Sequence, residues 1–251
     1  MSPTMEKLRR LKLQGMARAL EEQNKGSDFG RLDFNERLGH LVDSEQIQRE
    51  NQSMSRRLNR ARLRHNACVE DIDYRHPRGL DKSLMKKLSS CQWIKEHHNL
   101  VITGPTGVGK SFIGCALAHK ACLDGYNSAY YRAPRLFTYL EVAKAEGRYT
   151  KALQQIAKMD LLIIDDWGLT KINTREEQEL LEVMEDRYEL RSTIILSQIP
   201  LKDWHELIPN KTIADAVLDR IIHNAYRMEL KGDSLRKTEN KTTAKKENDE
   251  K

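Results

Sequence analysis

The stretch that decides the fold is NLVITGPTGVGKS, residues 99–111, in which a short apolar run leads into a glycine-rich loop. Its second part, Gly104–Ser111, matches the pattern G-x-x-x-x-G-K-[ST] at every fixed position. The run Leu100–Ile102 has the composition of a buried strand, and an amphipathic helix is expected over residues 110–122. A strand, a glycine loop and a helix in this order predict a phosphate-binding turn at the edge of a sheet.

The loop itself predicts a site for a nucleoside triphosphate. Glycines let the backbone wrap around phosphates, and the amides at the start of the helix face them. The expected cradle comprises Gly104, Pro105, Thr106, Gly107, Val108, Gly109, Lys110 and Ser111. Lys110 is expected to reach the β- and γ-phosphates, and Ser111 to hold Mg²⁺. The alternative is a glycine-rich turn that only closes a loop.

A pair of acidic residues follows another apolar run, LLIIDD, which ends in Asp165 and Asp166. Four apolar residues before a carboxylate place it at the carboxyl end of a strand, where open α/β sheets bind ligands. Asp165 is therefore the expected Mg²⁺-side acid, and Asp166 could orient and activate a water against the γ-phosphate. The alternative is two solvated acids in a loop.

Further polar residues are expected near the phosphates. Ser197 and Gln198 end a later apolar run, so either of them could position the attacking water. Arg220 lies in LDRII on an expected helix and is predicted to contact the γ-phosphate of a neighbouring subunit; the alternative is a solvated charge or an intradomain salt bridge. Arg236, in GDSLR, is a candidate for a second phosphate-sensing arginine.

The surrounding sequence alternates strand-like and helix-like segments. The other short apolar runs are Ser128–Tyr131, Leu161–Ile164, Ile194–Leu196 and Tyr226–Leu230. Helix-period segments lie between them, notably residues 110–122 and 174–190, and Thr174 with Glu177 is the expected capping box of the latter. This alternation predicts a three-layer α/β domain with a largely parallel sheet over residues 71–236.

The two ends of the chain differ from this domain. Residues 1–70 have apolar positions at helical spacing, interrupted at Gly26–Gly30, which predicts two or three short helices rather than one long one. Such a unit buries little area, so we expect it to pack on a neighbouring copy or on the main domain. Residues 237–251 are polar and charged, which predicts a disordered tail.

Composition narrows the class of protein. The formal net charge of +6 favours a polyanionic partner. No run approaches the roughly 18 apolar residues of a membrane span, and no signal-peptide pattern opens the chain. The four cysteines form no CxxC pair, which favours reduced thiols and a cytoplasmic location over a zinc site or a disulfide framework.

Taken in order, the motifs resemble those of a known class of enzymes. Gly104–Ser111, Leu161–Asp166, Ser197–Gln198 and Asp219–Arg220 are arranged as in the AAA+ ATPases of the initiator and helicase-loader group. The expected fold is therefore a P-loop three-layer sandwich with a small helical domain at the N-terminus.

Three segments narrow the resemblance to one family. LLIIDDWG, Ser197–Ile208 and Asp215–Lys237 are similar to the IstB family of insertion-sequence helper ATPases. The resemblance implies an ATP- and Mg²⁺-dependent oligomer, a ring or helical assembly, that binds double-stranded target DNA and stimulates a partner transposase. Replicative helicase loaders of the DnaC type share the ATPase core and are the nearest alternative.

Two basic segments are candidates for DNA binding. Residues 133–158 are long enough for two helices, and initiator-type AAA+ proteins resemble this in carrying an extra helix that lines a DNA path. The expected phosphate contacts here are Arg132, Arg135, Lys144, Arg148 and Lys151. A second cluster, spaced for one helix face, comprises Arg56, Arg57, Arg60 and Arg64. For the first segment, the alternative is a charged helix surface that faces solvent. For the arginine cluster, the alternative is binding to an acidic face of the next subunit.

Two other functions are compatible with a P-loop. A small-molecule or nucleoside kinase would carry an arginine-rich lid, and the sequence has no such insertion near the phosphates. A kinase of this kind would also not explain the net positive charge. A binding module without hydrolysis would use ATP only to license assembly.

Overall fold

The computed structural model describes residues 2–26 and 28–235 and divides into two compact units, one ending at Arg56 and the other beginning at Arg57. This division lies before the compositional boundary near residue 70. The reason is that residues 57–70 pack with the second unit: Ala61 and Ala67 are fully buried, and Ala67 belongs to that unit's core. The expected disordered tail, residues 237–251, lies outside the described residues.

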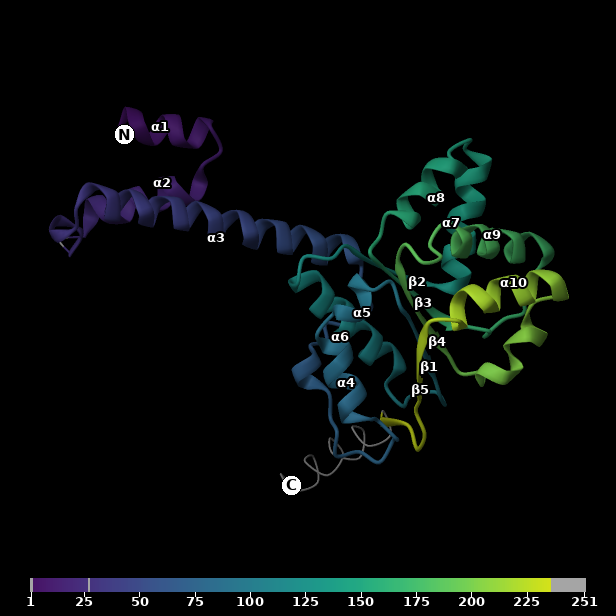
Figure 1. The fold of residues 1–251 in the computed structure, drawn as a ribbon. Helices are drawn as coiled ribbons and strands as arrows, with labels where there is room; N and C mark the ends of the chain where they lie inside the picture. The colour runs from purple at the N-terminus through teal and green to yellow at the C-terminus, as the bar shows by residue number, and fades with distance from the viewer. Residues whose placement is uncertain (1, 27, 236–251) are drawn as a thin grey trace, which may run out of the picture. The chain divides into compact units, whose positions relative to one another are not determined.

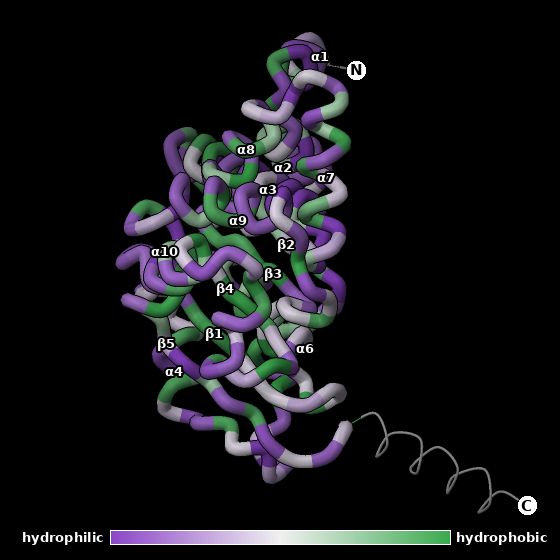
Figure 2. The backbone as a smooth tube through the Cα atoms, turned by 90° about the vertical axis from the view of Figure 1, so that its right-hand side faces the viewer, coloured by the Kyte–Doolittle hydropathy of each residue, from purple (hydrophilic) through white to green (hydrophobic). Residues whose placement is uncertain are grey.

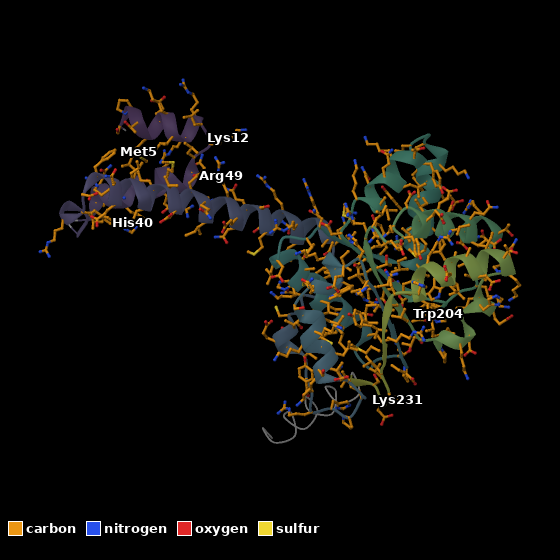
Figure 3. The ribbon with its side chains drawn as sticks, in the orientation of Figure 1. Met5, Lys12, His40, Arg49, Trp204 and Lys231 are labelled. Atoms are coloured by element: carbon orange, nitrogen blue, oxygen red, sulfur yellow. The ribbon has the colours of Figure 1, made fainter. Side chains whose placement is uncertain are left out.

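The first unit is helical. It contains α1 (Pro3–Arg10), α2 (Gln14–Lys25), the short 3₁₀ helix η1 (Asp28–Arg31) and the start of α3 (Phe34–Ala61). The predicted break near Gly26–Gly30 is confirmed, but the prediction of short helices is wrong for α3, which runs through 28 residues because nothing after Gly39 interrupts it. Met5 is buried between α1 and α2 (Figure 3).

Close contact between α2 and α3 depends on Gly15. A Cβ there would lie 2.4 Å from the carbonyl oxygen of Ser44. The Gly15 amide donates to Oε2 of Glu45 at 2.8 Å, so a buried carboxylate from α3 joins the two helices.

The second unit is built on a five-stranded sheet, and all five predicted strands are confirmed. They are β1 (Asn99–Thr103), β2 (Ser128–Arg132), β3 (Leu161–Trp167), β4 (Ser192–Ser197) and β5 (Ala225–Glu229). The order across the sheet is β2-β3-β4-β1-β5, and every pair is parallel. The expected α/β fold with a parallel sheet is therefore confirmed.

Helices cover both faces of this sheet (Figure 1). They are α4 (Lys82–Ser89), α5 (Gln92–Lys95) and α6 (Lys110–Leu123) on one face, and α7 (Ala133–Ala145), α8 (Tyr149–Ala157), α9 (Thr174–Glu185) and α10 (Lys211–Ile222) on the other. Two 3₁₀ helices, η2 (Val69–Asp71) and η3 (Leu201–Leu207), lie in the connections. The tube in Figure 2 is hydrophobic along the central strands.

Each face of the sheet has its own core. On β1, Leu100 and Ile102 point into the core beneath α4, α5 and α6, whereas Val101 points into the core beneath α7 to α10. This alternation is the period of two that a strand imposes on its side chains. Trp204 of η3 fills the second core, as Figure 3 shows.

The start of α9 differs from the prediction by one residue. Asn173 is the N-cap, and its side chain and that of Glu176 form the reciprocal capping box. The predicted box of Thr174 and Glu177 is wrong because asparagine is a good cap acceptor at the preceding position. Glu177 is buried instead and accepts a hydrogen bond from a backbone amide of the α10 cap. Residues 186–190 lie beyond the helix, which ends sooner than predicted.

The topology places the candidate motifs at one edge. Because β3, β4 and β1 are neighbours and parallel, their carboxyl ends lie side by side. The glycine loop follows β1, the acids end β3, and Ser197 ends β4. Among the described residues, no helix is long and apolar enough to span a membrane.

Candidate nucleotide-binding site

A cavity of about 610 Å³ opens at this edge of the sheet. Its volume is within the range of roughly 300–1,000 Å³ that is usual for small-molecule sites. It is lined by the glycine loop with Lys110 and Ser111, by Asp165 and Asp166, by Gln198, and by the basic residues Arg64, Arg78 and Arg132. Segments far apart in the sequence thus converge on one hollow.

The glycine loop has a backbone that only glycine adopts easily. Gly107 and Gly109 have φ angles of +85° and +96°. A Cβ on Gly107 would lie 2.0 Å from Oγ of Ser234, and one on Gly109 would lie 2.4 Å from Nη1 of Arg78. A side chain at either position would therefore be strained. Helix α6 begins directly after the loop without a side-chain cap, and its first residues line the cavity.

Lys110 is the first residue of α6 and is buried. Its Nζ donates to the carbonyl oxygens of Gly104 and Pro105, at 2.6 and 2.8 Å. Burial lowers the pKa of Lys110, while the charges of Asp165 and Asp166 oppose that shift. A cation held by neutral carbonyls keeps its charge available to an anionic ligand.

The two acids lie in an irregularity of β3. The register of β3 against β4 shifts between Ile164 and Trp167, and Asp166 has a φ of +58°. Such a bulge re-aims side chains and often occurs beside functional sites. Both carboxylates therefore face the cavity, rather than alternating across the sheet as in a regular strand.

Asp165 is almost fully buried and held by two hydrogen bonds. The hydroxyl of Tyr130 on β2 donates to its Oδ2 at 2.5 Å, and the amide of Asp166 donates to its Oδ1 at 2.7 Å. Burial, followed by this bond to Asp165, raises the pKa of Tyr130. Tyr130 therefore remains a protonated donor that fixes the orientation of the carboxylate.

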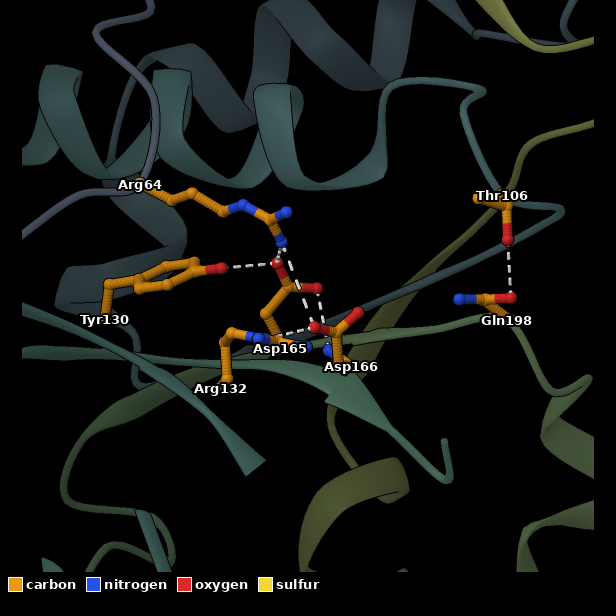
Figure 4. Close-up of polar contacts among 7 residues, drawn as sticks. All are labelled: Arg64, Thr106, Tyr130, Arg132, Asp165, Asp166 and Gln198. Carbon is orange, nitrogen blue, oxygen red and sulfur yellow. Dashed lines mark hydrogen bonds and ion pairs between the residues drawn. The ribbon is translucent and has the colours of Figure 1, made fainter. Parts of the chain in front are cut away.

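Two guanidinium groups approach the acids (Figure 4). Nε of Arg132 donates to Oδ2 of Asp166 at 2.5 Å. Nη1 of Arg64 lies 3.7 Å from Oδ2 of Asp165 and 3.9 Å from Oδ2 of Asp166. Both arginines were predicted to contact DNA, yet the structure places them in this cavity.

Ser197 and Gln198 have different surroundings. Ser197 is fully buried; its Oγ donates to the carbonyl of Trp167 and accepts from the amide of Ile199. Gln198 lines the cavity, and its Oε1 accepts a hydrogen bond from Oγ1 of Thr106 at 2.6 Å (Figure 4). Of the two candidates left open by the sequence, Gln198 is the one that faces the cavity.

Arg220 lies at the other end of the sheet. The side chain of Asn99, at the start of β1, donates to the carbonyl of Arg220. The guanidinium pairs with Glu185, donates to the carbonyl of Ala216 at 2.8 Å and lies 5.8 Å from the ring centre of Tyr188. Arg220 therefore does not reach the cavity of its own chain. Arg236 lies outside the described residues.

The remaining predicted DNA contacts lie on exposed surfaces. The segment after β2 forms the expected two helices, α7 and α8, and Arg135, Lys144, Arg148 and Lys151 are all exposed. Arg148 pairs with Glu146, and Nζ of Lys144 lies 5.4 Å from the ring centre of Tyr149.

The basic cluster before residue 65 does not form one helical face. Helix α3 ends at Ala61, and Arg62 has a φ of +50°, so the prediction is wrong for Arg64, which follows the end of the helix. Arg56 and Arg60 are exposed. Nε of Arg57 donates to the carbonyl of Cys122 at 2.9 Å.

Two residues of the site were not predicted. Tyr130 is one of them; it lies on β2 beside β3, so only the order of the strands brings it to the site. Arg78 is buried, and its guanidinium donates to the carbonyls of Val108 and Asp73 at 2.9 Å each, which ties the glycine loop to the segment before α4. It lies in an irregular segment with no motif, so the sequence carries no signal for it.

These residues fit a nucleoside triphosphate with a divalent cation. The loop supplies backbone amides and the Lys110 cation for phosphates. The Ser111 hydroxyl and the Asp165 carboxylate, both at the cavity, are hard oxygen donors of the type that Mg²⁺ prefers. Asp166 adds a second carboxylate that could orient a water.

Comparison with known proteins agrees with this geometry. The family model of IstB-like ATP binding proteins matches residues 6–244. A protein named as an insertion sequence ATP-binding protein, y4pL of Sinorhizobium fredii, is 48% identical over 237 residues, which is 94% of this chain and 97% of that protein. A protein named as the insertion sequence IS21 ATP-binding protein of Pseudomonas aeruginosa is 30% identical over 229 residues. The matched region is 91% of this chain and 86% of that protein.

Solved structures share the fold. The DnaC helicase loader superposes with a TM-score of 0.55 at 20% identity, covering 66% of this chain and 97% of its own. AMPPCP-bound DnaA from Aquifex aeolicus superposes with a TM-score of 0.57 at 18% identity, covering 74% and 57%. The likeness to these structures is one of fold, and it agrees with the parallel α/β sheet described above. Given the match of the family model over nearly all of the sequence, the chain belongs to the family of IstB-like ATP binding proteins.

Proposed function

We propose that this protein is an ATPase that assembles as an oligomer on duplex DNA and assists a transposase during transposition. The names of its relatives, which place them in insertion sequences, support the transposition context. The observation that carries the enzymatic part is the convergence of Lys110, Asp165 and Asp166 on one cavity. Loading of a replicative helicase is less favoured, because the likeness to loaders is one of fold.

Each residue of the cavity has a distinct role in this proposal. The loop amides and Lys110 bind the triphosphate. Ser111 and Asp165 would hold Mg²⁺, which neutralises phosphate charge when it is bound. Asp166 orients a water for in-line attack on the γ-phosphate, and Gln198, which lines the cavity and bonds to Thr106, is the second candidate for positioning that water.

The helices α7 and α8 are the proposed DNA-contacting surface. Their exposed lysine and arginine side chains supply phosphate contacts, which set affinity but not sequence choice. The stretch begins at Ala133, directly after Arg132, whose side chain holds Asp166. The first proposed DNA contact on α7, Arg135, is therefore three residues from the arginine that holds Asp166, which gives DNA a short route to the rate of hydrolysis.

We expect duplex DNA to accelerate ATP turnover, and the double substitution Arg135→Ala/Lys151→Ala to weaken that effect. Removing two phosphate contacts lowers the slope of log affinity against log salt by about 2. Salt-dependent DNA binding and DNA-stimulated turnover measure both quantities. Lys86→Ala/Lys95→Ala is the control, since it removes the same charge from exposed positions on α4 and α5. Equal DNA affinity and salt slope in both double variants would contradict this surface.

Arg220 is proposed to act on the nucleotide of a neighbouring protomer, because its own cavity is at the opposite end of the sheet. Arg220→Ala should lower turnover about tenfold or more while leaving ATP affinity unchanged, since the phosphate charge it stabilises develops during hydrolysis. In an equal mixture of Arg220→Ala and Lys110→Ala chains, about one interface in four pairs an intact cradle with an intact arginine. Roughly a quarter of wild-type turnover is therefore expected, and no recovery in the mixture would argue against action between protomers.

A further inference from the structure

A strap of residues 57–67 contains the last turn of α3 and the segment that leads from it to the nucleotide site. At its start, Nε of Arg57 donates to the carbonyl of Cys122 at the end of α6. Its interior is fixed by Ala61 and Ala67, which are both fully buried. Between these anchors, the side chain of Arg64 extends into the cavity and lines it.

The guanidinium of Arg64 faces both acids of the site. Figure 4 shows it above the carboxylate of Asp165, with the hydroxyl of Tyr130 on the same side. Its separations from the two carboxylates, 3.7 and 3.9 Å, are within ion-pair range but too long for a hydrogen bond. The Arg64 side chain is 38% exposed, whereas that of Asp165 is 2% exposed.

At these distances Arg64 can be displaced from the two acids by another cation. The two ion pairs with the acids are partly exposed and lack a hydrogen bond, so they contribute little free energy and another cation can displace them. The strongest interaction of Arg64 is a hydrogen bond with the side chain of Tyr130, which raises the pKa of Arg64 more than either acid does. The other cations near the acids are held more firmly: Arg132 donates directly to Asp166, and Lys110 donates to two carbonyls. Of the two arginines at the acids, Arg64 has the longer contacts with the carboxylates, and it is therefore the one that a divalent cation bound to them would displace.

Building on the proposed nucleotide site, we propose that Arg64 is a positioning residue that competes with Mg²⁺ for Asp165 and Asp166. While no divalent cation is bound, Arg64 compensates the charge of the two acids and secures the strap. When Mg²⁺ takes the acids, the guanidinium is released, and the strap loses the ion pairs at its centre. Because the strap includes the last turn of α3, Mg²⁺ binding at the site would be transmitted to the end of that helix.

The competition has two measurable consequences. Removing the Arg64 charge leaves the carboxylates without their rival cation, so Mg²⁺ should bind more tightly. The half-saturating Mg²⁺ concentration for binding of a fluorescent ATP analogue should fall by about threefold in Arg64→Ala, on the order expected for a partly exposed ion pair. Arg64→Lys, which retains the charge, should restore most of the wild-type value.

The second readout is conformational and does not depend on activity. Backbone amides of residues 62–66 should exchange hydrogen for deuterium faster in wild-type protein with ATP and Mg²⁺ than with ATP and EDTA. In Arg64→Ala the exchange should already be fast and independent of Mg²⁺. Arg62→Asn is the matched control, because it removes an exposed charge from the same strap, and asparagine tolerates the positive φ.

The outcomes separate this inference from the proposed function. If wild-type protein binds no ATP, both are overturned. If it binds ATP but Arg64→Ala and Arg62→Asn have the same Mg²⁺ dependence, or if Mg²⁺ leaves strap exchange unchanged in the wild type, only the role of Arg64 is overturned. Arg64→Gln is measured alongside, so that a folding defect in the alanine variant does not decide the result.

Discussion

Replacing Lys110 by alanine is expected to abolish nucleotide binding at physiological concentrations and to lower ATP turnover by about 10²–10³-fold. The ammonium group is buried at the start of α6 and is bonded only to neutral carbonyls, so its charge is directed to the phosphates rather than to an acid. Removing it leaves Asp165 and Asp166 facing the site with one cation fewer. The repulsion that they exert on a triphosphate then adds to the loss of the direct contact.

The same substitution should leave the fold nearly unchanged. Burial lowers the pKa of Lys110, which means that the folded protein bears a cost for keeping this charge. The alanine variant no longer bears the cost of burying this charge, and this gain offsets the loss of the two hydrogen bonds. The free energy of unfolding should therefore change by no more than about 1 kcal/mol. Lys120→Ala is the control on the same helix, where Nζ pairs with Asp124 at 2.6 Å on a partly exposed surface. Calorimetric ATP titration and urea unfolding measure both effects; an Lys110→Ala variant with unchanged ATP affinity would contradict the assignment.

The fold could be predicted from the sequence because its strands are short, apolar and separated by turns. The run LLII between polar residues can be satisfied only by burial on both faces, and β3 is buried throughout its first five residues. The length of α3 could not be predicted in the same way. Its apolar positions lack a continuous stripe, and what prolongs it is the absence of a breaker after Gly39 together with packing against α2 at Gly15.

Site residues that belong to a single sequence motif could be predicted. Contacts between residues from different segments could not be predicted as easily. Lys110 and Ser111 follow from a single pattern, and Asp165 follows from its place after an apolar run. The contact between Tyr130 and Asp165 requires the order of the strands. Once β2 is known to lie beside β3, with Tyr130 opposite Ile163, the period of two puts Tyr130 and Asp165 on the same face.

Arg64 and Arg132 illustrate a different difficulty. Both belong to basic segments, and composition does not distinguish an arginine that contacts DNA from one that neutralises buried acids. Arg132 reaches the carboxylates because it lies opposite Asp165 on the neighbouring strand. Arg64 reaches them because α3 ends before it. Net charge thus predicts a polyanionic partner for the chain as a whole, but it does not decide which arginines serve that partner.

Arg187→Met is expected to destabilise the second unit by about 3 kcal/mol. This arginine is fully enclosed, and burial lowers its pKa to about 9. Its guanidinium donates to the carbonyls of Ile156 and Met159 at 2.8 Å each, to the carbonyl of Ser192, and to Oγ1 of Thr193 at 3.1 Å. Methionine fills similar space but removes all four of these hydrogen bonds; the carbonyl of Ile156 keeps the backbone amide of Met159 as a donor, whereas each buried acceptor left without a donor costs roughly 1–3 kcal/mol.

Two opposing effects decide the sign of this change. Removing a buried charge saves the cost of desolvating it, which can make an apolar replacement neutral or stabilising. Here the charge is shared among four acceptors, and the loss of all of them outweighs that saving. Arg191→Met is the control, because Arg191 pairs with Asp160 at 3.7 Å on a partly exposed surface, where a change of no more than about 1 kcal/mol is expected. Urea unfolding of both variants measures the difference, and an Arg187→Met protein as stable as the wild type would show that desolvation prevails.

The functional consequence of Arg187→Met should be local to α8. Ile156 and Met159, at and just after the end of α8, lose the cation that ties them to the start of β4. The proposed DNA-contacting helices then lose their anchor, whereas the glycine loop, at the other end of the sheet, keeps all its hydrogen bonds. At a temperature where the variant remains folded, DNA affinity should therefore fall several-fold while ATP affinity stays within about twofold of the wild type. Equal losses of both affinities would instead indicate global unfolding and remove the specific link between this buried arginine and the surface of α8.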